Sequence, residues 1–191
     1  MPPLRSFIAI ELPPHIRVSL ERITSQLKTA ATDVRWVKTD DIHLTLKFLG
    51  AIEEERVPEI AGCIEQCIAG ILPFTISVRC LGAFPNDHNP QVIWIGVVDE
   101  GGRLSIIQQA LEIALARIGF KSEKRPFAPH LTLGRLKSPR GKEAARKGIE
   151  DFKYADCGSY EVGTICLFKS DLKPSGAVYT ILKSFSLHAH G

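Results

Sequence analysis

The stretch "IHLTLKFLG" at residues 42–50 contains a tetrapeptide, HLTL, that the chain repeats in "PHLTLGRL" at residues 129–136. Short runs of apolar and β-branched residues bounded by Gly or Pro predict strands. In a strand the side chains alternate between two faces, so the His and Thr of each copy share one face and the two leucines share the other. Each copy therefore predicts a strand that is anchored by its leucines and presents a histidine and a threonine together.

The segments around the two copies follow a repeated order of elements. Apolar spacing in the first half predicts a strand, a helix, the first motif strand, a helix and a strand at 4–12, 16–30, 42–50, 57–67 and 74–84. The second half predicts a strand, a helix, the second motif strand, a short basic helix and two strands at 92–98, 104–118, 129–136, 141–150, 160–169 and 177–188. We therefore expect a single domain over 1–191, made of two internal repeats at about 4–84 and 91–188. A pseudo-two-fold relation between the repeats brings the motif strands together beside a shared cleft.

The composition is typical of a globular protein that binds a small anionic ligand or a nucleic-acid end. With 191 residues, 45% of them hydrophobic, the chain can bury a substantial core, and its formal net charge of +3 is too small for coating long nucleic acid. The five cysteines include no CxxC pair, which argues against a disulfide framework and a zinc site. No apolar run approaches the roughly 20 residues of a membrane span, so we expect a cytoplasmic protein without a membrane partner.

The repeated histidine and threonine predict acid–base chemistry on a phosphoryl group. The ordinary pKa of histidine lies near neutrality, so of two imidazoles across a cleft one can accept a proton while the other donates one. His43 and His130 are therefore the candidate catalytic residues, and the hydroxyl groups of Thr45 and Thr132 can donate hydrogen bonds to phosphoryl oxygens. This chemistry requires no metal and no cofactor, and the sequence contains no carboxylate cluster that would hold a metal. A single His-x-Thr on a strand is ordinary, and the alternative is a duplicated motif that only forms a binding cleft.

Four segments resemble the 2H phosphoesterase superfamily, and within it the bacterial and archaeal RNA 2′,3′-cyclic phosphodiesterases, also called 2′-5′ RNA ligases. They are "RSFIAIELP" at 5–13, "RWVKTDDIHLTLKFLG" at 35–50, "RPFAPHLTLGRLK" at 125–137 and "SDLKPSGAVYTIL" at 170–182. The resemblance covers essentially the whole chain. It implies an α+β fold with two pseudo-symmetric lobes, each with an antiparallel sheet and helices, and an active-site cleft between them.

The same resemblance implies hydrolysis of a 2′,3′-cyclic phosphate to a 2′-phosphomonoester. On that basis His43 is the proton donor to the departing 3′ oxygen, and His130 is the proton acceptor that activates water. Thr45 and Thr132 stabilise the charge that develops on the phosphoryl oxygens. The expected partner is RNA with a 2′,3′-cyclic phosphate end, or a small nucleotide, and we expect the protein to be a monomer.

Two further substrate-binding residues, Phe48 and Arg135, each follow their motif histidine by five positions. Strict alternation places both on the face opposite the histidine, but a bulge or a strand end can redirect a side chain. The resemblance implies that Arg135 contacts substrate and that Phe48 lies near the nucleobase, where stacking contributes about 1–3 kcal/mol. Lys47 and the basic segment 135–148 are open to two interpretations, contact with RNA phosphates or an ordinary solvated surface.

Three other functions remain open. An enzyme of the same superfamily can act on another cyclic nucleotide or on a 2′-5′-linked oligonucleotide. Ligation of a cyclic phosphate end to a 5′-hydroxyl end is the reverse reaction at the same site. The third alternative is a catalytically idle nucleotide-binding module. The family pattern S-x-L-x-x-x-G-x-x-Y also occurs at 170–179, where packing is a sufficient role for Tyr179.

Overall fold

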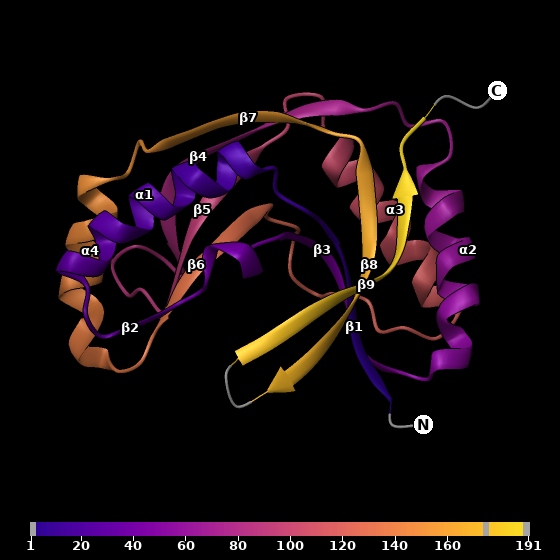
Figure 1. Cartoon of the computed structure of the whole chain (residues 1–191), viewed down its shortest axis with the longest axis horizontal. Coiled ribbons are helices and arrows are strands. Elements are labelled where there is room, and N and C mark those ends of the chain that lie inside the picture. Colours follow the sequence, from indigo (N-terminus) through magenta and orange to yellow (C-terminus); the bar gives the residue numbers. More distant parts are fainter. Residues whose placement is uncertain (1–2, 174–175, 189–191) are drawn as a thin grey trace.

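The computed structural model describes residues 3–173 and 176–188, which form two antiparallel sheets (Figure 1). The strands are β1 (Leu4–Ile10), β2 (Val34–Trp36), β3 (Leu44–Ile52), β4 (Phe74–Phe84), β5 (Val92–Val98), β6 (His130–Leu136), β7 (Asp156–Val162), β8 (Thr164–Lys173) and β9 (Gly176–Ser186). The helices are α1 (Pro14–Ala30), α2 (Val57–Ile68), α3 (Arg103–Arg117) and α4 (Lys142–Asp151), and the 3-10 turns are η1 (Thr39–Asp41), η2 (Glu54–Arg56) and η3 (Pro139–Gly141).

Each sheet carries two helices and forms one lobe. The four-stranded lobe has the strand order β3-β1-β8-β9 and is covered by α2 and α3, whereas the five-stranded lobe has the order β2-β6-β5-β4-β7 and is covered by α1 and α4 (Figure 1). This arrangement confirms the expected α+β fold with two pseudo-symmetric lobes.

The two halves of the sequence interlock instead of forming one lobe each. The first half supplies β1, β3 and α2 to the four-stranded lobe, but its helix α1 and strand β4 contact β7 in the five-stranded lobe. In return α3, β8 and β9 come from the second half and complete the four-stranded lobe. Both lobes therefore require both halves of the chain.

Two features of the strands differ from the sequence-based expectation. The strand predicted at 160–169 is two strands, β7 and β8, which separate at Gly163 and belong to different sheets. Apolar residues on both sides of that glycine, Tyr160 and Val162 before it and Ile165 to Phe168 after it, hide the break. Strand β2 was not expected, because its three residues are too few to produce a periodic pattern.

The leucines of both motifs lie in the core, as the alternation predicted. Leu44 and Leu131 are fully buried, and Leu46 and Leu133 are at most 3% exposed. Burying one such side chain contributes about 1.5–3 kcal/mol relative to exposure. The HLTL strands are therefore held by their apolar face.

A β-bulge interrupts the first motif at its fourth residue. Ala9 pairs with Thr45 and the preceding Ile8 pairs with Lys47, so Leu46 is an extra residue on β3. An extra residue reverses the facing of every later side chain in its strand. After the bulge, Phe48 lies beside Phe7, on the face that Thr45 occupies, because Phe7 and Ala9 share one side of β1.

The second motif contains a bulge at the same position. Trp94 pairs with Thr132 and the preceding Ile93 pairs with Gly134, which leaves Leu133 as the extra residue on β6. Arg135 then pairs with Val92, on the same face as Thr132. Both motifs thus carry a bulge at their final leucine, and both bring the residue five positions after the histidine back to the histidine face.

The first bulge also turns Lys47 into the protein. Its ammonium lies 2.7 Å from Glu112 Oε2 on α3 and 2.7 Å from the carbonyl oxygen of Lys121, and its side chain is only 5% exposed. Glu112 accepts a further hydrogen bond from the Glu123 amide at 3.1 Å. Both interpretations of Lys47 from the sequence, contact with RNA and solvated surface, are therefore wrong. The residue instead links β3 to the segment that leads toward the second motif.

We expect the substitution Lys47→Met to lower the free energy of unfolding by about 3 kcal/mol, because it leaves a buried carboxylate without its cation. Lys183→Met is the matched control, since Lys183 pairs with Glu65 at 2.8 Å on the surface and its loss costs less than about 1 kcal/mol. Urea-induced unfolding measures the change in the free energy of unfolding for both variants. Adding Glu112→Gln to Lys47→Met should recover part of the loss, and equal costs for the two lysine variants would contradict a stabilising role of the buried pair.

Candidate functional site

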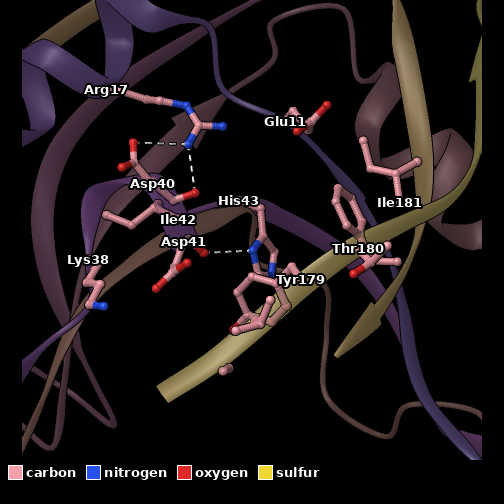
Figure 2. A pocket seen from close by; sticks show the side chains of 13 residues that line it. Glu11, Arg17, Lys38, Asp40, Asp41, Ile42, His43, Tyr179, Thr180 and Ile181 are labelled. Atoms are coloured by element: carbon pink, nitrogen blue, oxygen red, sulfur yellow. Dashed lines mark hydrogen bonds and ion pairs between the residues drawn. The ribbon is translucent and has the colours of Figure 1, made fainter. Parts of the chain in front are cut away.

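The imidazole of His43 is held in one tautomer at the start of β3. Its Nδ1 lies 2.9 Å from the carbonyl oxygen of Asp41, and since a carbonyl only accepts, Nδ1 carries the hydrogen. The ring stacks on Phe7 with centroids 4.5 Å apart. It meets Tyr179 edge-on at 5.0 Å (Figure 2). This leaves Nε2 as the nitrogen available to a ligand.

His130 repeats the arrangement at the start of β6. Its Nδ1 donates to the carbonyl oxygen of Ala128 at 2.7 Å, again two residues before the histidine. Phe84 meets the ring edge-on at 4.8 Å and Trp94 lies at 6.3 Å. The two motifs therefore present equivalent imidazoles, each anchored through Nδ1 and each with Nε2 available for proton transfer.

The chain ties the two motifs to each other. Strand β2, seven residues before the first motif, pairs with β6, and the Val37 amide donates to the carbonyl oxygen of Leu133 at 2.8 Å. From there the chain runs through η1 directly to His43. Strands β3 and β6 also approach each other where the lobes meet. The position of the first histidine thus depends on the strand that carries the second.

Arg17 fixes the turn before His43. Its guanidinium donates to the Leu12 carbonyl at 2.9 Å. It also donates to the Asp40 carbonyl at 2.7 Å and lies 3.8 Å from the Asp40 carboxylate (Figure 2). These contacts hold η1, whose last residue, Asp41, orients the imidazole. Nothing in the sequence indicates this role, because an arginine in the first turn of an amphipathic helix looks like an ordinary surface residue.

The environment of His43 favours its neutral form. Burial lowers the pKa of His43 to about 4; the hydrogen bond to Asp41 opposes this shift and the positive charge of Arg17 adds to it. At neutral pH the free protein therefore holds His43 as an uncharged imidazole. Such a group carries no proton on Nε2 and can donate one only after a ligand has raised its pKa.

A pocket of about 530 Å³ opens beside His43 and is bounded by both lobes. Its lining includes Arg17 from α1, Asp41 from η1 and Tyr179 from β9 (Figure 2). Phe168 from β8 also lines it. Among the described residues, those of the second motif do not line this pocket. The volume lies within the range of small-molecule sites, so a nucleotide can enter next to Nε2 of His43.

The structure places the remaining predicted site residues on the histidine faces. Thr45 and Thr132 are half-buried, two residues after their histidines. Phe48 is 68% exposed with its ring 6.2 Å from that of Phe7, and Arg135 is exposed. Strict alternation had placed Phe48 and Arg135 on the opposite faces, and the two bulges account for the difference.

Tyr179 is a site residue that sequence reasoning assigned only to packing. It contacts the His43 ring and lines the pocket. Burial raises the pKa of Tyr179; the Asp41 carboxylate adds to that effect, while the positive charges of Arg5 and Arg135 oppose it. The phenol therefore keeps its proton and can donate a hydrogen bond.

The part of the chain that the structure describes contains neither a cluster of metal-ligating side chains nor a helix able to span a membrane. Residues 3–173 and 176–188 contain no cluster of three or more His, Cys, Asp or Glu side chains arranged to hold a metal ion. None of the helices in these ranges is long and apolar enough to span a membrane.

Curated relatives with similar sequences include several proteins named RNA 2′,3′-cyclic phosphodiesterase. A protein of Methanothermobacter thermautotrophicus named RNA 2′,3′-cyclic phosphodiesterase is 34% identical over 96% of this chain and 99% of its own length. A protein of Thermotoga maritima with the same name is 31% identical over 94% of this chain and 93% of its own length.

Solved structures of the same size share the fold. The crystal structure of TT0787 of Thermus thermophilus superposes with a TM-score of 0.82 at 28% identity, over 98% of this chain and all of its own. Escherichia coli LigT complexed with 3′-AMP gives a TM-score of 0.78 at 26% identity, over 97% of this chain and 98% of its own. The pattern of the family described as LigT like Phosphoesterase matches twice, at residues 10–94 and 95–179, so this chain belongs to the LigT-like phosphoesterases.

Proposed function

We propose that this protein is an RNA 2′,3′-cyclic phosphodiesterase that opens the cyclic phosphate to a 2′-phosphomonoester. The observation that carries the proposal is the pair of equivalent imidazoles, each anchored through Nδ1 and each followed by a threonine on the same face. The names of the relatives from Methanothermobacter and Thermotoga support the same substrate.

The reaction is an in-line attack of water on phosphorus, with proton transfer at both ends. His130 Nε2 accepts a proton from the water as its oxygen bonds to phosphorus. The bond from phosphorus to the 3′ oxygen breaks, and that oxygen takes a proton from His43 Nε2. Thr45 and Thr132 donate hydrogen bonds to the nonbridging oxygens of the phosphate. These bonds stabilise the negative charge that develops on those oxygens while the water oxygen bonds to phosphorus. Arg135 binds the substrate through the negative charge of the substrate. Phe48 contacts the nucleobase.

His43 gains its second ring proton when the substrate binds. The free protein keeps this imidazole neutral because burial lowers its pKa to about 4. A bound phosphodiester places a negative charge beside Nε2 and favours the imidazolium, since an opposite charge within about 4–6 Å shifts a pKa by roughly 1–3 units. Substrate binding thus prepares the proton donor.

We further propose that the chain acts as one domain of two internal repeats, as a monomer in the cytoplasm. The two matches of the family pattern support the division into repeats. Free cysteines at five positions are compatible with a reducing compartment.

We expect the purified protein, in EDTA, to convert an RNA oligonucleotide with a 2′,3′-cyclic phosphate end into one with a 2′-phosphate end. His43→Ala and His130→Ala should each lower kcat/KM by about 100-fold to 10,000-fold, the usual contribution of a general acid or base. Product analysis by mass spectrometry and phosphatase sensitivity measures the reaction. His88→Ala, which changes an exposed histidine in the turn after β4, serves as the control. Activity that appears only with a divalent ion, or that survives both histidine substitutions, would contradict the mechanism.

We expect the pKa of His43 to rise by at least about one unit when a nucleoside 2′-phosphate binds, because the phosphate stabilises the imidazolium. Nuclear magnetic resonance of histidine labelled with ¹³C at Cε1 reports this pKa in the free and bound protein, with His43→Gln identifying the signal. A value that stays near 4 in the complex would assign proton acceptance to His43 and reverse the two roles.

A further inference from the structure

Trp94 lies beside the second motif, on the sheet face that carries His130. It pairs with Thr132 on β6 and with Gly82 on β4, and directly opposite residues share a face of the sheet. The isoleucines on either side of it in the chain are buried in the core, so the half-buried indole points to the opposite face. The motif face of the five-stranded sheet therefore places a tryptophan next to the second histidine.

The indole occupies the space that a side chain at residue 82 would need. A Cβ atom added to Gly82 would lie 2.5 Å from both Cη2 and Cζ2 of Trp94, closer than real Cβ contacts. Gly82 does not have a positive φ, so its backbone conformation does not require glycine. The missing side chain at this position is therefore what allows Trp94 to lie where it does.

Trp94 is connected to the His130 ring mainly through Phe84. The rings of Trp94 and Phe84 have centroids 5.3 Å apart, and Phe84 meets His130 edge-on at 4.8 Å. The direct distance between the Trp94 and His130 rings is longer, 6.3 Å. The residue opposite His130 on β5 is Gly96, which offers no side chain to the imidazole. The two aromatic rings thus complement the hydrogen bond from Nδ1 in setting the orientation of His130.

The indole N–H of Trp94 takes no part in this arrangement. It is buried and has no acceptor among the residues that the structure describes. A buried donor without an acceptor is unfavourable, so packing alone would favour phenylalanine at this position. What tryptophan adds is the size of its ring system, which covers Gly82 and still contacts Phe84.

We propose that Trp94 is a positioning residue for His130 that acts through Phe84, and that Gly82 leaves the room that the indole needs. One hydrogen bond holds Nδ1 of His130, and the ring can still tilt about it. The rings of Trp94 and Phe84 limit that tilt and keep Nε2 directed at the attacking water. The proposal rests on the proposed function, because it names what orients the group that accepts the proton there.

The test measures kcat and KM of Gly82→Ala and Trp94→Ala with an RNA oligonucleotide that ends in a 2′,3′-cyclic phosphate. We expect each variant to lower kcat by about 10-fold to 100-fold and to leave KM within about twofold, because a misplaced general base affects the reaction more than binding. Trp94→Phe should keep part of the lost rate. The double variant of Gly82→Ala with Trp94→Ala should be no slower than Trp94→Ala, because no indole remains for the new Cβ to displace.

The matched control is Gly62→Ala on α2, because a Cβ atom there meets nothing within 4 Å, and it should keep the wild-type kcat. A second comparison shows whether Trp94 acts through His130. In single-turnover measurements on the His130→Ala background, Trp94→Ala should cause no further loss of rate, because the group that it positions is gone. A loss that persists in that background would overturn the proposal, and so would a loss in KM instead of kcat or a wild-type kcat in Gly82→Ala and Trp94→Ala.

A readout without substrate separates this proposal from the proposed function, which fails by itself if the wild type does not hydrolyse the oligonucleotide. Nuclear magnetic resonance of ¹⁵N-labelled histidine in alkaline buffer reports the tautomer of the His130 ring, with His130→Gln identifying the signals. The wild type and Gly62→Ala should show the tautomer with the hydrogen on Nδ1, and Gly82→Ala should show a mixture of both tautomers. Ring signals that are the same in Gly82→Ala and the wild type would overturn the positioning role.

Discussion

The placement of the functional side chains depends on one backbone feature, the β-bulge at the last leucine of each HLTL. Leu46 and Leu133 are the extra residues, and both are buried. Their burial holds the bulges in place, because a slip of one residue would expose these leucines and move Lys47 out of its contact with Glu112. A regular strand would present that lysine to the cleft and bury Phe48 in the core. The bulges convert an alternating strand into one that presents His, Thr and a third side chain on one face.

The sequence predicted the elements well and the bulged positions poorly, for a physical reason. Apolar periodicity reports which side chains are buried, so it identified the motif strands, their leucine anchors and the His-x-Thr face. A bulge leaves no such mark, because it is decided by the register with the neighbouring strand. Phe48, Arg135 and Lys47 were therefore uncertain on alternation alone. The contact of Tyr179 with His43 likewise joins residues from opposite halves of the chain, and no local pattern predicts it.

Two identical tetrapeptides acquire different surroundings because the halves interlock. His43 stacks on Phe7 of its own half, but its edge contact is Tyr179 from the far end of the chain. Arg17 stands close enough to lower its pKa further, and burial supplies most of the shift. His130 instead meets Phe84 and Trp94. A duplicated motif can therefore supply two distinct proton-transfer groups, since the difference between acid and base arises from what the fold packs around each copy.

The short strand β2 connects the two motif histidines. It pairs with β6 and continues within seven residues to His43. The Val37 amide donates to the carbonyl oxygen of Leu133, the bulged residue of the second motif, directly after that pairing. The chain then enters the turn whose last residue, Asp41, orients the His43 ring. The orientation of the first imidazole therefore depends on the same strand that carries the second.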